Sequence, residues 1–249
     1  MKKDVVLVPA QSKRLIAKAF LQSEVFSGAI KDKKIIICKG TTNSYVVEEF
    51  LKKKIDKERF TTGVVMPGGE YWIENEKMLE YVIDKGVANE RNLCDVIKEI
   101  NPGDIILKGA NSINYAKETA GILIRHPEGG TVKRIFEAVF GKRANLIIPV
   151  GLEKEVSYDL DEVSLMLSED DCCEECPRMY SFKAQLFTEI EAIKVLTLGK
   201  VSSYHIATGG IKGAQGAIRL LLNGEKEYIE EIEALIERLP LKDEFDLRD

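Results

Sequence analysis

The sequence is poor in the residue types that mark several specialised classes of protein. Its 249 residues include only 5 cysteines, 2 histidines and 1 tryptophan. An odd, low cysteine count does not suit the disulfide framework of a secreted protein. No apolar stretch approaches the roughly 20 residues of a membrane span, and the apolar residues before Pro9 are too few for a secretory signal. We therefore expect a cytoplasmic protein with no membrane partner.

Basic residues are also in deficit. Lys plus Arg is 36 and Asp plus Glu is 41, so 36 − 41 gives a net charge of −5. General nucleic-acid binding requires clustered Lys and Arg, and we expect no nucleic-acid partner. The balance of 45% apolar and 31% charged residues is that of a globular protein. We expect one α/β domain over residues 1–249, with an insertion or small subdomain over residues 151–185.

Short apolar runs alternate with helical patterns along the chain. Residues 35–38, 104–107 and 144–150 are typical of strands buried in a parallel sheet. Residues 201–207 form the last expected strand, and a helix over residues 217–222 is expected to follow it. This alternation predicts a mostly parallel, Rossmann-like sheet with helices on both faces.

Other helices are expected where apolar residues recur at helical spacing. One begins at Ser12 as its N-cap and continues to Phe20. A second follows a Gly/Thr loop and starts at Tyr45, and a third covers residues 228–239.

Three polar or glycine-rich loops follow predicted strands, and each carries a lysine. In open α/β sheets, ligands bind at the carboxyl ends of the strands, where backbone N–H groups favour anions. We therefore expect these loops to converge on a small anionic metabolite. The predicted ligand-binding residues are Lys39, Gly40, Thr41, Thr42, Asn43 and Ser44 in loop one; Gly109 and Asn111, after Lys108, in loop two; and Thr208, Gly209, Gly210, Lys212 and Gly213 in loop three. No Walker motif or full dinucleotide fingerprint is present, and we expect no cofactor.

Loop one and its surroundings resemble a known superfamily. Residues 39–44, followed by a helix, resemble the first phosphate loop of the ribose-5-phosphate isomerase, glucosamine-6-phosphate deaminase and CoA-transferase-like fold, and the sugar-phosphate-sensing domains of DeoR-type repressors. Residues 104–109 are similar to the isomerase strand that leads into a Lys-Gly loop. The resemblance covers residues 13–150. It implies that fold, a sugar phosphate or CoA ester as ligand, a homo-oligomer, and a catalytic carboxylate near Glu118.

The candidate catalytic residues suit proton transfer next to a carbonyl. That chemistry requires a carboxylate base and a cation that holds the enediolate. We assign Glu118 as the base and Lys108 as its electrostatic partner, and Asp104 would either orient Lys108 or cap the strand end. His205 lies in the strand before loop three and is an acid–base candidate.

Two alternatives to an isomerase-like enzyme remain open. The same pocket without turnover would make the chain a metabolite sensor. The Cys172-Cys173-x-x-Cys176 cluster would suit a thiol or metal protein, although a closed zinc site needs four ligands, and we predict no metal site.

Overall fold

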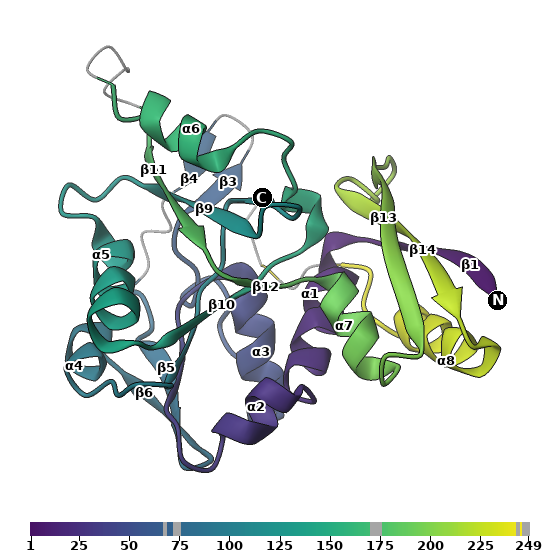
Figure 1. The fold of residues 1–249 in the computed structure, drawn as a ribbon, viewed down its shortest axis with the longest axis horizontal. Helices are drawn as coiled ribbons and strands as arrows, with labels where there is room; N and C mark the ends of the chain where they lie inside the picture. Colours follow the sequence, from purple (N-terminus) through teal and green to yellow (C-terminus); the bar gives the residue numbers. More distant parts are fainter. Residues whose placement is uncertain (67–68, 72–75, 170–175, 243–244, 246–249) are drawn as a thin grey trace.

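A six-stranded mixed sheet forms the centre of the molecule (Figure 1). The computed structural model describes residues 1–66, 69–71, 76–169, 176–242 and 245. The strands of the sheet lie in the order β12-β10-β7-β2-β5-β6. Their bounds are β12 Gln185–Phe187, β10 Asn145–Pro149, β7 Ile105–Leu107, β2 Ile35–Ile37, β5 Glu80–Asp84 and β6 Val87–Arg91.

The first four strands of this order are parallel, whereas β5 and β6 form an antiparallel hairpin. Residues 35–37 and 105–107 are almost fully buried, as their uninterrupted apolar runs predict for strands covered on both faces. The expected strands over residues 35–38, 104–107 and 144–150 are confirmed. The fold is α/β, and the central sheet is mixed: the four strands from β12 to β2 are parallel, and the other two are antiparallel.

Two groups of helices cover the central sheet. Helix α1 (Pro9–Phe20) packs against α3 (Thr41–Leu51) and α7 (Glu189–Leu196), with the short α2 (Glu24–Ala29) nearby. On the opposite side, α4 (Leu93–Lys98) packs against α5 (Gly130–Phe136), which continues as a π-helical turn, η1 (Glu137–Gly141). Figure 1 shows the sheet between these two groups.

Two helices begin earlier than the sequence predicts. Helix α1 starts at Pro9 with Val8 as its N-cap, so Ser12 lies inside the first turn. Proline is well tolerated at a first helical position, since its missing N–H has no partner there. Helix α3 starts at Thr41 after the N-cap Gly40. The expected loop over residues 40–44 is therefore mostly the first turn of that helix.

A separate antiparallel sheet has the order β1-β14-β13 and packs on α8 (Lys226–Glu237). Its strands are β1 (Lys2–Leu7), β13 (Val201–Gly209) and β14 (Ala217–Gly224). The expected helix over residues 217–222 is wrong, because this segment is β14. Ile218, Leu220 and Leu222 are buried and Arg219 is exposed between them. That period of two is typical of a strand with one buried face.

The remaining elements lie beside the central sheet. The three-stranded sheet β11-β9-β8 is formed by β11 (Arg178–Lys183), β9 (Thr119–Ile124) and β8 (Ser112–Asn114). Helix α6 (Leu160–Met166) packs on β11, and the 3-10 turn η2 (Leu152–Lys154) precedes it.

The segment over residues 61–77 contains the hairpin of β3 (Val64–Met66) and β4 (Gly69–Tyr71). Its residues 67–68 and 72–75 lie outside the described residues. Across the described chain, no helix has both the length and the apolar character needed to cross a bilayer.

Candidate functional site

Loops one and two meet at one edge of the central sheet. The backbone N–H of Cys38 donates to the carbonyl of Leu107 at 2.9 Å. The Asn43 side-chain amide donates to the same Leu107 carbonyl at 3.1 Å and to the Cys38 carbonyl at 2.8 Å. Asn43 is fully buried, so its role here is to hold the first turn of α3 against the ends of β2 and β7.

A cavity of about 280 Å³ opens beside the end of β7. Lys108 and Asn111 line it together with the end of β9 and the glycine turn before α5. The further lining residues are Thr62, Gly63, Ile122, Leu123, Ile124, Arg125, His126, Gly129, Gly130, Thr131 and Val132. The cavity therefore combines an apolar wall with cationic and amide groups, which is the usual composition of a small-molecule site.

Lys108 is the least well paired cation of this cavity. Among the described residues, the only hydrogen bond of its ammonium is a long one of 3.4 Å, from Nζ to the carbonyl of Gly109. Burial lowers the pKa of Lys108, although the neighbouring Cys38 and Glu80 oppose that shift. A desolvated ammonium group with so little compensation provides a favourable contact for an anion.

Two amide and imidazole groups complete the polar lining. Asn111 Oδ1 accepts the N–H of Leu123 at 3.0 Å, which fixes the orientation of the side-chain amide. His126 Nδ1 accepts the N–H of Glu128 at 3.1 Å, so the hydrogen of a neutral His126 is on Nε2. Both side chains then have a hydrogen-bond donor left for a ligand.

Lys39 lies at the end of β2 but is already paired. Its ammonium is 3.0 Å from Glu80 Oε1 and donates to the carbonyl of Met78 at 3.1 Å. Gly40 donates its N–H to the Phe60 carbonyl. Thr42, Asn43 and Ser44 are buried, so most of loop one supports the site rather than facing a ligand.

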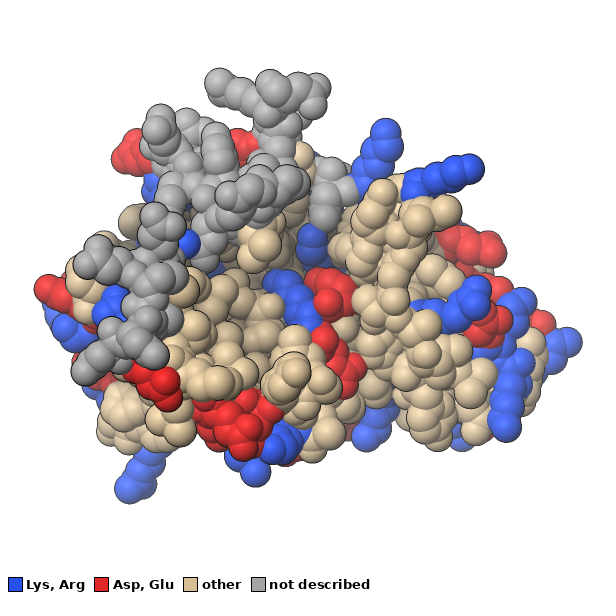
Figure 2. Space-filling view, turned by 90° about the horizontal axis from the view of Figure 1, so that it is seen from above, with Lys and Arg blue, Asp and Glu red and all other residues tan. Residues whose placement is uncertain are grey.

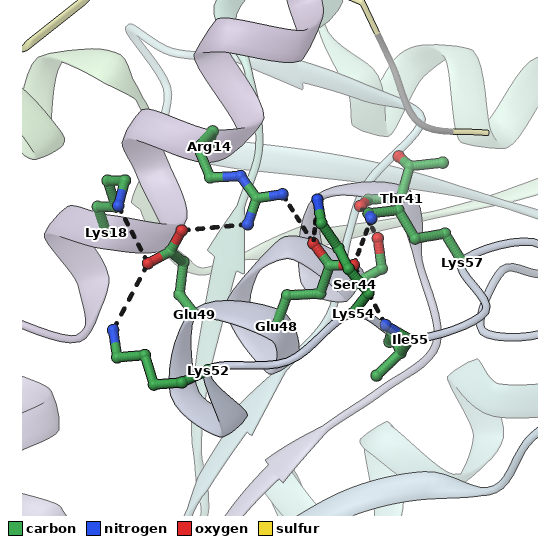
Figure 3. A network of polar contacts seen from close by, with 10 residues as sticks. All are labelled: Arg14, Lys18, Thr41, Ser44, Glu48, Glu49, Lys52, Lys54, Ile55 and Lys57. Carbon is green, nitrogen blue, oxygen red and sulfur yellow. Dashed lines mark hydrogen bonds and ion pairs between the residues drawn. The ribbon is translucent and has the colours of Figure 1, made fainter. Parts of the chain in front are cut away.

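A network of ion pairs fixes helix α3 in place (Figure 3). Glu48 accepts hydrogen bonds from Arg14 Nη2 at 2.7 Å, from the backbone N–H of Ile55 at 3.2 Å and from Lys57. Glu49 binds the other nitrogen of Arg14 at 3.1 Å. Figure 3 shows the guanidinium between the two carboxylates, which ties α1 to α3.

The same network borders a hollow of about 460 Å³ that is rich in lysine. Its cations include Lys18 and Lys52, which lie 3.2 Å and 3.7 Å from Glu49 Oε2. Because these charges already have carboxylate partners, we interpret this hollow as part of the structural network rather than as the ligand site.

Two carboxyl groups that sequence reasoning missed lie at the ends of β10 and β12. Glu189 Oε2 accepts the N–H of Leu152 at 3.0 Å, whereas Glu189 Oε1 and Glu153 Oε2 are buried and have no hydrogen-bond partner within the described part of the chain. Gly151 permits their approach, because a β-carbon at this residue would lie 1.8 Å from Glu153 Oε2 and 3.0 Å from Glu189 Oε1. Burial, together with the charge of Glu153, raises the pKa of Glu189 to about 8. The pair is therefore expected to hold a proton at neutral pH.

Lys154 connects these carboxyl groups to the cavity. Its ammonium donates to the carbonyl of Ala110 at 2.9 Å, and Ala110 lies between the two cavity residues Lys108 and Asn111. Burial lowers the pKa of Lys154, and the charges of Lys13 and Lys108 act in the same direction. Groups with displaced pKa values thus follow three neighbouring parallel strands, β7, β10 and β12, which is common at functional sites.

Two predicted catalytic residues lie away from Lys108. Asp104 is at the opposite end of β7, where its carboxylate accepts the backbone N–H groups of Lys34 at 2.9 Å and Asn101 at 2.8 Å. The proposed orientation of Lys108 by Asp104 is therefore wrong. Glu118 is exposed in the turn between β8 and β9, with a positive φ of 54°, and does not line the cavity.

Loop three belongs to the other sheet. Thr208 and Gly209 end β13, and Gly210, Lys212 and Gly213 form the exposed connection to β14. Within the described residues, no hydrogen bond or ion pair joins residues 208–213 to loop one or loop two. The cavity that Lys108 and Asn111 line includes no residue of loop three. The helix that was expected to follow loop three is a strand, so the connection is a hairpin.

His205, the remaining acid–base candidate, does not line the cavity. It lies on β13, and its ring nitrogens contact Glu155 and Thr208. Glu155 follows Lys154 in sequence, so this contact joins the antiparallel sheet to the segment after β10.

The cysteine cluster is described only in part. Cys172 and Cys173 lie outside the described residues, and Cys176 is disulfide-bonded. Cys38 and Cys94 are free thiols, the former buried and the latter exposed. Among the described residues, no group of three or more His, Cys, Asp or Glu side chains is arranged to hold a metal ion.

Charges of both signs are interspersed on the face shown in Figure 2. Lysine and arginine side chains alternate there with acidic ones, and the visible surface carries no extended basic patch.

The chain matches no protein-family model, no curated protein and no solved structure. What the fold and the cavity define is an α/β protein with a polar cavity at the ends of its parallel strands. Its function has to be inferred from that site.

Proposed function

We propose that the chain binds a small phosphorylated or otherwise anionic metabolite in the cavity beside β7, with Lys108 as the principal contact. The observation that carries the proposal is the desolvated Lys108 ammonium, whose only described hydrogen bond is 3.4 Å long. The side-chain amide of Asn111 and the Nε2–H of His126 would donate hydrogen bonds to the same anion.

The size of the cavity favours one of the two ligand classes. A volume of about 280 Å³ is at the lower limit of the roughly 300–1,000 Å³ typical of ligand sites. A sugar phosphate would fill such a cavity, whereas a CoA ester would place most of its mass outside. We therefore favour the sugar phosphate as the ligand. We also propose that the fold has the Rossmann-like, isomerase/CoA-transferase-like topology whose members bind such ligands.

We further propose that the bound metabolite undergoes isomerisation or a related proton transfer. Lys108 would stabilise the developing enediolate charge. The protonated Glu153–Glu189 pair and Lys154 do not line the cavity themselves, but Lys154 contacts the carbonyl of Ala110 between the lining residues Lys108 and Asn111. These three groups would hold or release a proton near neutral pH from behind that segment. A non-catalytic sensor would use the same cavity without turnover.

A binding experiment tests the first part of this proposal. Isothermal titration with ribose 5-phosphate, inorganic phosphate and acetyl-CoA should detect the sugar phosphate most strongly. Lys108→Met should weaken binding at least tenfold, because it removes the charge and keeps the aliphatic stem. Lys212→Met, which removes a lysine of loop three, is the matched control and should bind as the wild type does. Equal weakening by both variants would contradict the assigned cavity.

Turnover distinguishes the enzyme from the sensor. The sugar phosphate that binds is incubated in deuterium oxide with wild type and with Glu189→Gln. Proton transfer is supported if deuterium is incorporated at the carbon next to the carbonyl and if this incorporation is lost in Glu189→Gln. Binding without exchange indicates a sensor.

A further inference from the structure

Strand β13 contains an irregularity that brings together two residues three positions apart. The pairing with β14 shifts between His205, opposite Leu220, and Ala207, opposite Arg219, so Ile206 is an extra residue. In a regular strand, residues i and i+3 point to opposite faces. A bulge reverses the alternation and re-aims a side chain. Here it places Thr208 Oγ1 2.7 Å from His205 Nε2.

The other nitrogen of the same imidazole contacts a carboxylate. His205 Nδ1 is 2.8 Å from Glu155 Oε2, which lies in the segment after η2. A carboxylate accepts hydrogen bonds, so Nδ1 carries the hydrogen and the lone pair of a neutral imidazole is on Nε2. That lone pair faces the Thr208 hydroxyl. Nε2 is also 3.2 Å from the carbonyl of Ala207, which would accept its hydrogen once Nε2 has gained a proton.

We propose that Thr208, His205 and Glu155 form a nucleophile–base–acid relay that accepts acyl groups from activated esters. The order of groups is hydroxyl, imidazole, carboxylate, with both links at hydrogen-bond distance, and this arrangement is recognised by geometry rather than by chain order. Thr208 is exposed, so an ester can reach its hydroxyl. The His205 side chain is only 17% exposed and that of Glu155 34%.

The reaction has two balanced steps. Thr208 Oγ1 attacks the ester carbonyl carbon while its proton passes to His205 Nε2. The bond to the leaving alcohol breaks, and the alcohol departs with that proton. Water then attacks the acyl-threonine, gives a proton to Nε2 and releases the carboxylic acid, while the proton on Nε2 returns to Thr208. Glu155 acts as a positioning residue, because it holds the imidazole tautomer and stabilises the imidazolium.

The apolar surroundings indicate the kind of acyl group. Ile206 is 52% exposed and Ile211 is 75% exposed, both on the β13–β14 hairpin that carries Thr208. Exposed branched side chains next to the nucleophile favour a short aliphatic acyl chain. The relay is independent of the Lys108 cavity, so either proposal can fail without the other.

Acylation by p-nitrophenyl acetate tests the relay. Intact-mass measurement and peptide mapping should find one acetyl group, on Thr208, with a burst of p-nitrophenol. Thr208→Val should lose the adduct and Thr208→Ser should keep it. His205→Gln should slow acylation at least 100-fold, the usual contribution of a general base. Ser202→Ala removes another exposed hydroxyl of β13 and should behave as the wild type.

The remaining outcomes also decide the question. Glu155→Gln should lower the rate constant of acylation at saturating ester. Its melting temperature should equal that of the wild type. No acetyl-threonine, acetylation confined to lysines, or an adduct on Thr208 that forms equally fast in His205→Gln would overturn the proposal.

Discussion

Asn43 spans the ends of two parallel strands: its side-chain amide donates to the carbonyl of Cys38 after β2 and to the carbonyl of Leu107 at the end of β7. The side chain thus acts as a substitute for a backbone hydrogen-bonding partner. Since buried carbonyls without donors are costly, the geometry of the strand ends depends on this one residue.

Replacing Asn43 should therefore lower the free energy of unfolding by more than the loss of its few side-chain atoms from the core would. Asn43→Ala removes both hydrogen bonds; the Leu107 carbonyl keeps the N–H of Cys38, whereas the Cys38 carbonyl loses its side-chain donor. We expect a loss of about 2 kcal/mol in the free energy of unfolding. Urea denaturation measures this loss. Asn223→Ala, an exposed position on β14, is the control and should change stability by less than about 0.5 kcal/mol.

Glu189 should make stability depend on pH above the acid range. Its pKa is raised from 4.5 to about 8 in the folded chain by burial and by Glu153. The contribution of the protonated form is complete below pH 4.5 and is lost as the pH rises through about 8, because the unfolded chain releases this proton earlier. Glu189→Gln carries no charge and donates to the free Glu153 oxygen, so it should lose less stability with rising pH.

Guanidinium denaturation between about pH 5 and about pH 9 measures this difference. Glu227→Gln, at an exposed position on α8, should keep the wild-type profile. Parallel curves for wild type and Glu189→Gln would show that the carboxyl pair does not hold the extra proton.

Glu48 should make stability depend on pH in the acid range. Burial works to raise its pKa, but hydrogen bonds from Lys57 and Arg14 outweigh that effect, and the pKa is lowered below 4.5. Its contribution is therefore present above pH 4.5 and is lost as the pH falls through the lower folded value.

Glu48→Gln should cost about 3 kcal/mol at neutral pH, since it removes the carboxylate that pairs with buried Lys57 and with one nitrogen of Arg14. The Glu48 side chain is 2% exposed and that of Glu49 12%, so Glu49→Gln should cost less. Acid titration of the circular dichroism signal measures the first effect, and denaturant unfolding at neutral pH compares the two variants.

Two glycines should respond in opposite ways to alanine. A β-carbon at Gly224 would lie 2.2 Å from the carbonyl oxygen of Lys200, whereas nothing lies within 4 Å of one at Gly28. Gly224→Ala should lower the melting temperature, because strands β13 and β14 would have to separate locally. Gly28→Ala, within helix α2, should raise stability by about 0.5–1 kcal/mol. A similar melting temperature for both variants would contradict the close approach.

Sequence patterns predicted the central strands because burial on both faces leaves a distinct signal. The runs over residues 35–38 and 105–107 are apolar throughout, so periodicity and length agree there. Residues 217–222 contain too many apolar residues to distinguish a strand from a helix by pattern alone. The partner strand β1, at the other end of the chain, decides the outcome.

Some residues of the candidate site were predictable from the sequence and others were not, for the same reason. Lys108 and Asn111 were predictable because their position after a buried strand fixes the edge at which they lie. Glu153 and Glu189 were not, since an isolated glutamate shows no sign of the second carboxyl group that will face it. The pairing of His205 with Thr208 depends on a bulge that no local pattern encodes.

The pairing of β1 with β14 also affects how the chain matures. Met1 donates its N-terminal ammonium hydrogen to the carbonyl of Gly224, 223 positions away. During synthesis the first strand leaves the ribosome long before its partner exists, while the parallel strands that follow are already able to assemble. Strand β1 must therefore remain without its partner until the segment that forms β14 has been synthesised.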